Sequence, residues 1–69
     1  MGKSHSDKLK SLLDAKYITQ TALAEIMNMS SATMHHRINN VGKFKLDELY
    51  ALANALNMSI VDLIKYLEK

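Results

Sequence analysis

Apolar residues recur along the chain at intervals of three and four positions, which is the spacing of one face of an α-helix. Five such stretches predict five short helices, at about residues 6–16, 20–27, 31–39, 46–56 and 60–68. Proline is absent and glycine occurs only twice, so few residues would break a helix and we expect an all-α fold. The apolar stripes are formed by Leu9, Leu12 and Leu13; Leu23, Ile26 and Met27; Met34 and Ile38; Leu49, Leu52, Ala53 and Leu56; and Ile60, Leu63, Ile64 and Leu67.

Residues that can cap helix ends support these boundaries. Thr19, Ser30 and Ser59 each precede a predicted helix, where a hydroxyl oxygen can accept a backbone N–H that has no partner within the helix. Asn28 and Asn57 stand where residues of left-handed conformation often end a helix. An apolar residue before each cap can pack on another five positions later as a hydrophobic staple. The pairs are Ile18 with Leu23, Met29 with Met34, Met58 with Leu63 and, beside Lys45 as a poor cap, Phe44 with Leu49.

Length and composition exclude several classes of protein. A chain of 69 residues has room for one domain, spanning 1–69, and for no large enclosed substrate pocket. Cysteine is absent, which excludes disulfides and thiolate metal sites. The longest apolar run, 49–53, is far too short to span a membrane. The polar start MGKSHSDK has no signal-peptide core, so we expect a cytoplasmic protein. We also expect a whole protein rather than a fragment, since the chain begins with Met and ends after a predicted helix.

Charge is distributed unevenly along the chain. The net charge is +2, but residues 28–45 carry Arg37, Lys43 and Lys45 with no acid, a net charge of +3. Residues 1–27 have four lysines against three acids, and residues 46–69 have two lysines against four acids. A basic stretch without carboxylates suits a polyanion such as nucleic acid, because a carboxylate would repel phosphate. In so short a chain, chance is the alternative explanation.

Two sequence motifs agree with this interpretation. The segment 19–40 reads TQTALAEIMNMSSATMHHRINN, and 44–64 reads FKLDELYALANALNMSIVDLI. Both resemble the Cro and lambda-type repressor family (the XRE family), and the resemblance covers about residues 7–67. It implies a compact five-helix, lambda-repressor-like domain with a central helix-turn-helix at about 19–39. The core of the motif would be Leu23, Ala24, Met29, Met34 and Ile38.

The sequence departs from the family pattern at four positions. The family often has an aromatic residue where Arg37 stands, Glu at Ile38, and Gly at Asn28 and near Asn40. Asparagine tolerates the left-handed conformation, so we expect Asn28 to serve in the turn. We expect Ile38 to make the apolar contact at the end of the third helix.

The third predicted helix has one apolar and one polar edge. At 100° per residue, Met34 and Ile38 share an edge that must face the core, and the opposite edge is centred near His36. Such an edge can read base edges in a major groove, or it can simply be solvated. The residues proposed for base contacts are Ser31, Ala32 and His36, whose roles the resemblance implies, together with His35 on the flank of this edge.

Residues around this edge are candidates for contacts to the DNA backbone. The resemblance implies such contacts for Gln20, at the start of the second helix, and for the loop after the third. Arg37 can reach a phosphate or cap the end of its helix. Each of these side chains can otherwise be an ordinary solvated group. The full set of phosphate candidates is Gln20, Thr33, Arg37, Asn39, Asn40, Lys43 and Lys45.

Metal binding and catalysis are disfavoured. His35 and His36 are adjacent, so they diverge by about 100° on a helix and cannot easily hold one ion. Protonation of these histidines could strengthen DNA binding. The chain shows no acid–base cluster, so we expect no enzyme activity, no metal and no cofactor. Methionines at apolar positions, such as Met27 and Met58, are expected to fill the core.

The sequence therefore predicts a small phage or bacterial transcriptional regulator that binds double-stranded DNA at an operator. Val61 and Tyr66 fall off the inward arc of the fifth helix, and they predict a homodimer contact that would double the site. They can equally be edge residues of a small protein. The alternative function is a protein–protein interaction module on the same fold, such as an anti-repressor or adaptor, since a fold does not fix a function.

Overall fold

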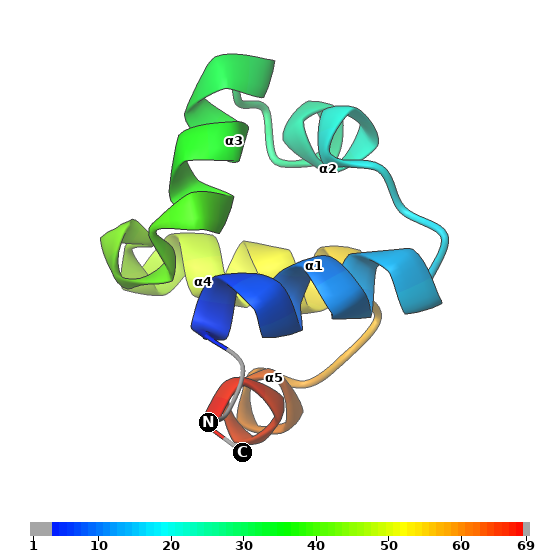
Figure 1. Ribbon diagram of the computed structural model, residues 1–69, viewed down its shortest axis with the longest axis vertical. Helices are drawn as coiled ribbons and strands as arrows, with labels where there is room; N and C mark the ends of the chain where they lie inside the picture. The colour runs from blue at the N-terminus through cyan, green and yellow to red at the C-terminus, as the bar shows by residue number, and fades with distance from the viewer. Residues whose placement is uncertain (1–3, 69) are drawn as a thin grey trace.

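The computed structural model describes residues 4–68 and confirms the all-α prediction (Figure 1). Its elements are α1 (His5–Ala15), α2 (Gln20–Ile26), α3 (Ser31–Asn39), a short 3₁₀ turn η1 (Val41–Lys43), α4 (Leu46–Ala55) and α5 (Ile60–Glu68). The helices begin and end within one residue of the predicted positions. The η1 turn was not predicted, because three residues are too few to show a hydrophobic period.

The predicted N-caps are confirmed. The hydroxyl oxygens of Thr19, Ser30 and Ser59 accept backbone N–H groups three residues ahead, at 3.0, 3.1 and 3.0 Å. Ser4, which we did not predict as a cap, does the same for α1 at 3.2 Å. Lys45 has no side-chain oxygen to offer; at the start of α4 the backbone N–H of Lys45 instead donates to the Glu48 carboxylate at 2.8 Å.

Three of the helices end in the same kind of turn. Asn28 after α2 and Asn57 after α4 have φ of 57° and 58°, as predicted. Tyr17 after α1 has φ of 58°, which the sequence did not signal. In each turn the next residue donates its N–H to a carbonyl five positions back: Ile18 to Leu13, Met29 to Ala24 and Met58 to Ala53, at 2.8–3.0 Å. This arrangement is the Schellman motif, which satisfies carbonyls left without a partner at the helix end.

The core follows most of the predicted apolar stripes. Leu9, Leu23, Met34, Ile38, Leu52 and Leu63 are fully buried. The first residues of three predicted staples, Ile18, Met29 and Met58, pack against this core. In the fourth staple Phe44 is part of the core and its partner Leu49 packs against it. For two members of the predicted stripes the prediction of burial is wrong, since Ile26 is 60% exposed and Ile64 is 44% exposed.

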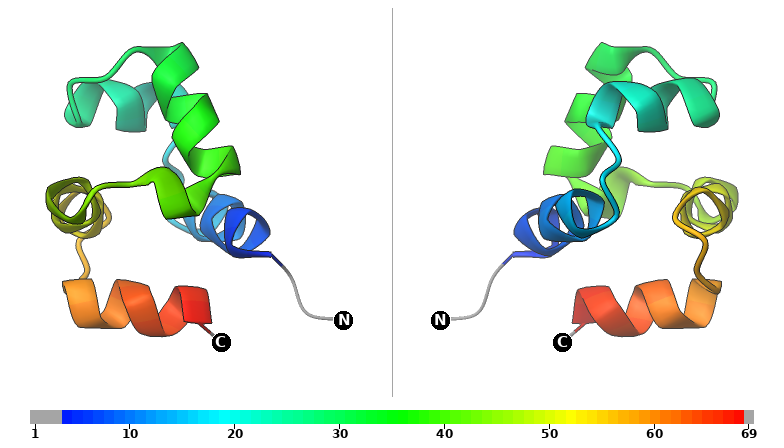
Figure 2. Two further views of the ribbon diagram at one scale, coloured as in Figure 1. Left: turned by 90° about the vertical axis from the view of Figure 1, so that its left-hand side faces the viewer. Right: turned by 90° about the vertical axis from the view of Figure 1, so that its right-hand side faces the viewer.

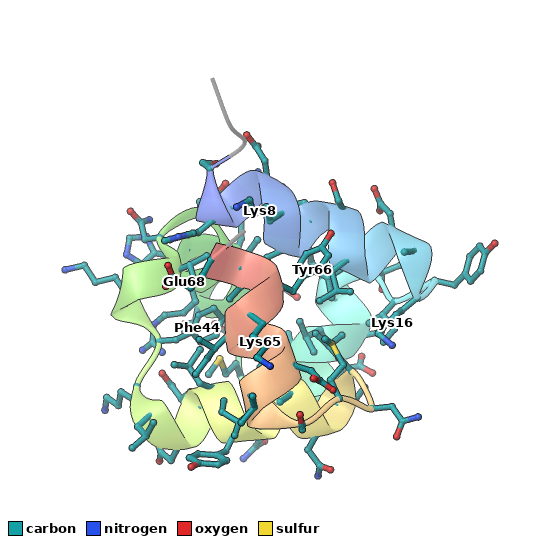
Figure 3. The ribbon with its side chains drawn as sticks, turned by 90° about the horizontal axis from the view of Figure 1, so that it is seen from below. Lys8, Lys16, Phe44, Lys65, Tyr66 and Glu68 are labelled. Carbon is teal, nitrogen blue, oxygen red and sulfur yellow. The ribbon has the colours of Figure 1, made fainter. Side chains whose placement is uncertain are left out.

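The helix α5 is rotated relative to its predicted orientation. Leu63 is at the centre of its buried face, which turns Ile64 outward and packs Tyr66 partly against the core. Our prediction that Tyr66 lies off the inward arc is therefore wrong, whereas Val61 is 55% exposed as expected. The cause is that α5 packs against both α1 and α4, which Figure 3 shows from below. Contact with two helices buries a wider face of α5 than contact with one, and this face includes Tyr66.

The arrangement separates α2 and α3 from α5. In Figure 1 α2 is seen nearly end-on while α3 lies in the plane of the picture. The two helices therefore meet at a steep angle, as is typical of a helix-turn-helix with a short connection. Both views in Figure 2 place α2 and α3 at one end of the molecule and α5 at the other. α1 connects the two ends: Ser6 donates to the carbonyl of Ile38 in α3 at 2.6 Å, and Lys8 donates to that of Leu67 in α5 at 3.3 Å. Among residues 4–68, no helix has the length and apolar content that crossing a lipid bilayer requires.

Candidate nucleic-acid interface

Helix α3 presents a polar, acid-free face to solvent. Met34 and Ile38 are completely buried, so the opposite edge of the helix must face outward, as predicted. The exposed residues of α3 are Ser31, Ala32, Thr33, His35, His36 and Asn39. These side chains can donate or accept hydrogen bonds, apart from Ala32, which offers a methyl group. The face therefore has the shape and chemistry that a major groove accepts.

The segment after α3 adds positive charge beside this face. Lys43, at the end of η1, and Lys45, just before α4, are both exposed. In Figure 1, α3 and η1 lie along the same side of the molecule. Since residues 28–45 contain no carboxylate, the charge there is cationic. Among residues 4–68 neither lysine forms an ion pair, so both predicted phosphate candidates are exposed cations in the segment that follows α3.

A chain of hydrogen bonds crosses the exposed face and connects three helices. His35 of α3 lies with Nδ1 3.3 Å from Oε1 of Gln20, at the start of α2. The Nδ2 of Asn39 lies 3.2 Å from Nε2 of His35, and Lys10 of α1 donates to Oδ1 of Asn39 at 2.8 Å. The sequence predicted Gln20, His35 and Asn39 as separate contacts, and it gave no role to Lys10. The spacing of four between His35 and Asn39 was the signal available for that one pair.

Several of the polar candidates also stabilise the ends of α3. The side-chain amides of Asn39 and Asn40 donate to the carbonyls of His35 and His36, at 2.8 and 3.0 Å. At the other end, the Ser30 hydroxyl lies 2.9 Å from that of Thr33. Asn40 has φ of −138°, so this position needs no glycine. These bonds hold the side chains at fixed places on the helix surface.

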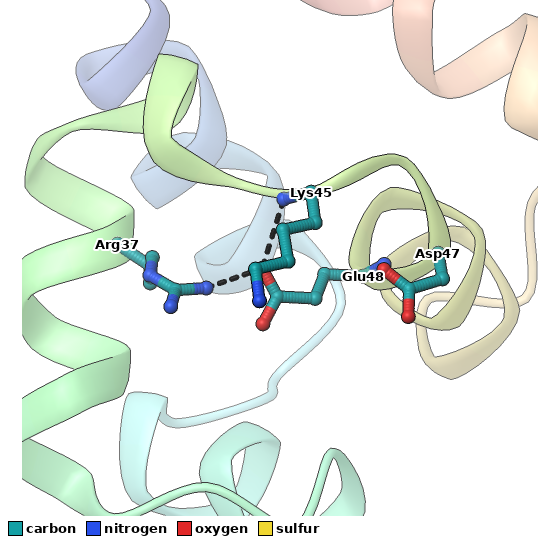
Figure 4. A network of polar contacts seen from close by, with 4 residues as sticks. All are labelled: Arg37, Lys45, Asp47 and Glu48. Atoms are coloured by element: carbon teal, nitrogen blue, oxygen red, sulfur yellow. Dashed lines mark hydrogen bonds and ion pairs between the residues drawn. The ribbon is translucent and has the colours of Figure 1, made fainter.

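Arg37 is paired with Glu48 (Figure 4). Its guanidinium donates to the carboxylate of Glu48, and the same carboxylate accepts the backbone N–H of Lys45. The backbone N–H of Glu48 in turn donates to the Asp47 carboxylate at 3.0 Å. The hydrogen bond from Arg37 lowers the pKa of the Glu48 carboxyl, and the same bond raises the pKa of Arg37. The sequence missed this pair because its partners lie on different helices. The predicted phosphate contact of Arg37 stays a prediction.

The surroundings of this face do not form a metal site. Within residues 4–68, no three side chains of His, Asp or Glu come together as they would around an ion. His35 is engaged with Gln20 and Asn39, and His36 is exposed on the outer edge. The geometry therefore offers hydrogen-bond donors and acceptors on a rigid helix.

The chain was compared with protein families, with curated proteins and with solved structures. A family model described as a Cro/C1-type HTH DNA-binding domain matches residues 8–69. Neither the comparison with curated proteins nor that with solved structures produced a match. The matched range contains α2, α3 and every candidate contact residue.

Proposed function

Because the chain belongs to the Cro/C1-type helix-turn-helix DNA-binding family, we propose that it is a sequence-specific transcriptional regulator, acting as a repressor that occupies an operator. In this proposal α3 enters the major groove. The observation that carries it is the exposed, acid-free polar face of α3, opposite the buried Met34 and Ile38. A buried apolar edge fixes which side chains the helix offers to DNA.

We assign base contacts to the outer edge of α3. Ser31 and His36 supply hydrogen-bonding groups, and Ala32 is suited to the methyl group of thymine. His35 flanks them, with both ring nitrogens within hydrogen-bond distance of Gln20 and Asn39. Contacts to the backbone come from the surrounding positions, which set the register of the protein on the duplex without reading sequence. The assigned backbone contacts are Gln20, Thr33, Arg37, Asn40, Lys43 and Lys45. Asn39, the remaining candidate, has both hydrogens of its NH₂ group directed to His35, so we assign it a supporting role beside these contacts.

A salt-titrated selection of DNA tests this function. The protein is incubated with a pool of genomic fragments at rising salt, and the retained fragments are sequenced. We expect binding that weakens steeply with salt, by a log–log slope of about −0.9 for each phosphate contacted, and a shared sequence among the fragments retained at high salt. No binding even at low salt would contradict the proposal and favour a protein-interaction module on the same fold.

We also propose that the protein binds DNA as a homodimer through α5. Val61 and Ile64 are exposed apolar residues on this helix, whereas Tyr66, which the sequence suggested, packs partly against the core. Because α5 lies away from α2 and α3 (Figure 2), a contact across it leaves α3 free. Two copies would read two half-sites and so raise affinity and specificity.

Replacing Val61 with aspartate is expected to convert a dimer to a monomer in sedimentation equilibrium. The substitution places a charge in the proposed apolar contact, and the exposed position lets the monomer fold normally. Ile26→Asp is the matched control, because Ile26 is exposed to a similar extent but lies on α2. A wild-type protein that sediments as a monomer at high concentration and on DNA would contradict this proposal.

A further inference from the structure

The hydrogen-bonded chain from Lys10 to Gln20 has a fixed direction. We infer that His35 is a positioning residue, which turns the side-chain amide of Gln20 so that its NH₂ group faces a phosphate of the DNA backbone. This inference rests on the proposed function, since it specifies how one backbone contact is made. It depends on which atoms in the chain can donate and which can only accept.

The direction is set at Asn39. The ammonium of Lys10 can only donate, and it lies 2.8 Å from Oδ1 of Asn39. The carbonyl of His35 can only accept, and it lies 2.8 Å from Nδ2 of Asn39. Turning the amide over would place its NH₂ group against an ammonium and its oxygen against a carbonyl. Asn39 is therefore held in one orientation from both sides.

The orientation of Asn39 determines the tautomer of His35. The Nδ2 of Asn39, a donor, lies 3.2 Å from Nε2 of the ring, so Nε2 must be the unprotonated, accepting nitrogen. The proton of the neutral imidazole is then on Nδ1. That nitrogen lies 3.3 Å from Oε1 of Gln20, which can accept it.

The tautomer in turn orients Gln20. Its carbonyl oxygen is directed toward His35, so its NH₂ group is left for another partner, and within residues 4–68 no hydrogen bond to that group is found. Phosphate oxygens only accept hydrogen bonds at neutral pH. A Gln20 amide turned the other way would present its oxygen to the phosphate and repel it. The opposite tautomer of His35 would favour that unproductive orientation.

The first experiment measures the tautomer in the protein without DNA. Two-bond ¹H–¹⁵N spectra in mildly alkaline buffer, where imidazoles are neutral, distinguish a proton on Nδ1 from one on Nε2. We expect the Nδ1–H tautomer for His35. Asn39→Asp removes the donor that faces Nε2 and is expected to shift the proton to Nε2. Asn40→Asp, which adds the same charge one residue later, is expected to leave the tautomer unchanged. An Nε2–H tautomer in the wild type, or no shift in Asn39→Asp, would overturn the inference.

The second experiment measures whether His35 acts through Gln20. Binding to a duplex of random sequence is measured for His35→Ala, Gln20→Ala and the double variant. We expect His35→Ala to weaken binding about fivefold in the wild-type background, the effect of one ordinary hydrogen bond, and less than about twofold when Gln20 is already alanine. Equal losses in the two backgrounds would show that His35 acts independently, and would overturn the inference. If the wild type binds no DNA while the Nδ1–H tautomer is observed, the proposed function fails. The positioning role of His35 toward a phosphate then fails with it.

Discussion

Replacing Met34 with alanine is expected to lower the free energy of unfolding by about 3 kcal/mol. The side chain is completely buried on the inner edge of α3, so its removal loses apolar contacts and leaves a cavity. A single core in a chain of this length supplies about 3–5 kcal/mol of net stability. Chemical denaturation followed by circular dichroism should therefore show a variant that retains at most about 2 kcal/mol of stability.

His36→Ala is the matched control for this substitution. It lies two residues further along the same helix, but on the exposed edge, so its unfolding free energy should change by less than about 0.5 kcal/mol. On DNA it should instead lose preference at one base position, an effect of about 1–3 kcal/mol. A large loss of stability in His36→Ala, or none in Met34→Ala, would mean that α3 is rotated from the orientation described.

Removing both lysines that follow α3 is expected to have the largest effect on DNA binding. In Lys43→Gln with Lys45→Gln, the slope of log affinity against log salt should become shallower by about 2, because each lysine that contacts a phosphate contributes about 0.9. Affinity at moderate salt should fall about tenfold or more for all sequences alike, since phosphate contacts do not distinguish bases. Fluorescence anisotropy with two unrelated duplexes over a range of salt measures both quantities.

The control for the lysine pair removes the same charge elsewhere. Lys16 follows α1, and Lys65 lies on α5, where Figure 3 shows it pointing away from the body of the protein. Lys16→Gln with Lys65→Gln should leave the salt slope nearly unchanged, because screening limits long-range effects of charge. If both double variants changed the slope equally, the loop after α3 would have no special place in the interface.

The helices could be predicted from the sequence because their signals are local. A period of 3.6 residues, a hydroxyl at each N-cap and an asparagine after α2 and α4 all act within a few residues of one another. Tyr17 shows where such signals stop: it adopts the same left-handed conformation with a side chain that does not favour it. The backbone bonds of the turn, from Tyr17 to Asp14 and from Ile18 to Leu13, impose the conformation there.

The contacts around the candidate interface were less predictable because they join distant parts of the chain. Which face of α3 is exposed could be predicted from the spacing of Met34 and Ile38 alone. The pairing of Arg37 with Glu48 and of Lys10 with Asn39 depends on how helices cross, which no spacing within one helix reveals. The rotation of α5 has the same origin, since packing against two helices at once decides which of its apolar residues is covered.

The repeated turn at the ends of α1, α2 and α4 affects how the chain reaches its native structure. Each turn is closed by bonds that span at most six consecutive residues, so these helix ends form without searching for a remote partner. Helical proteins whose contacts are close in sequence fold within microseconds to milliseconds. By contrast, the hydrogen bond from Lys8 to Leu67 joins residues 59 positions apart in the sequence. Docking of α5 onto α1 is thus the folding step that must close the longest loop of chain.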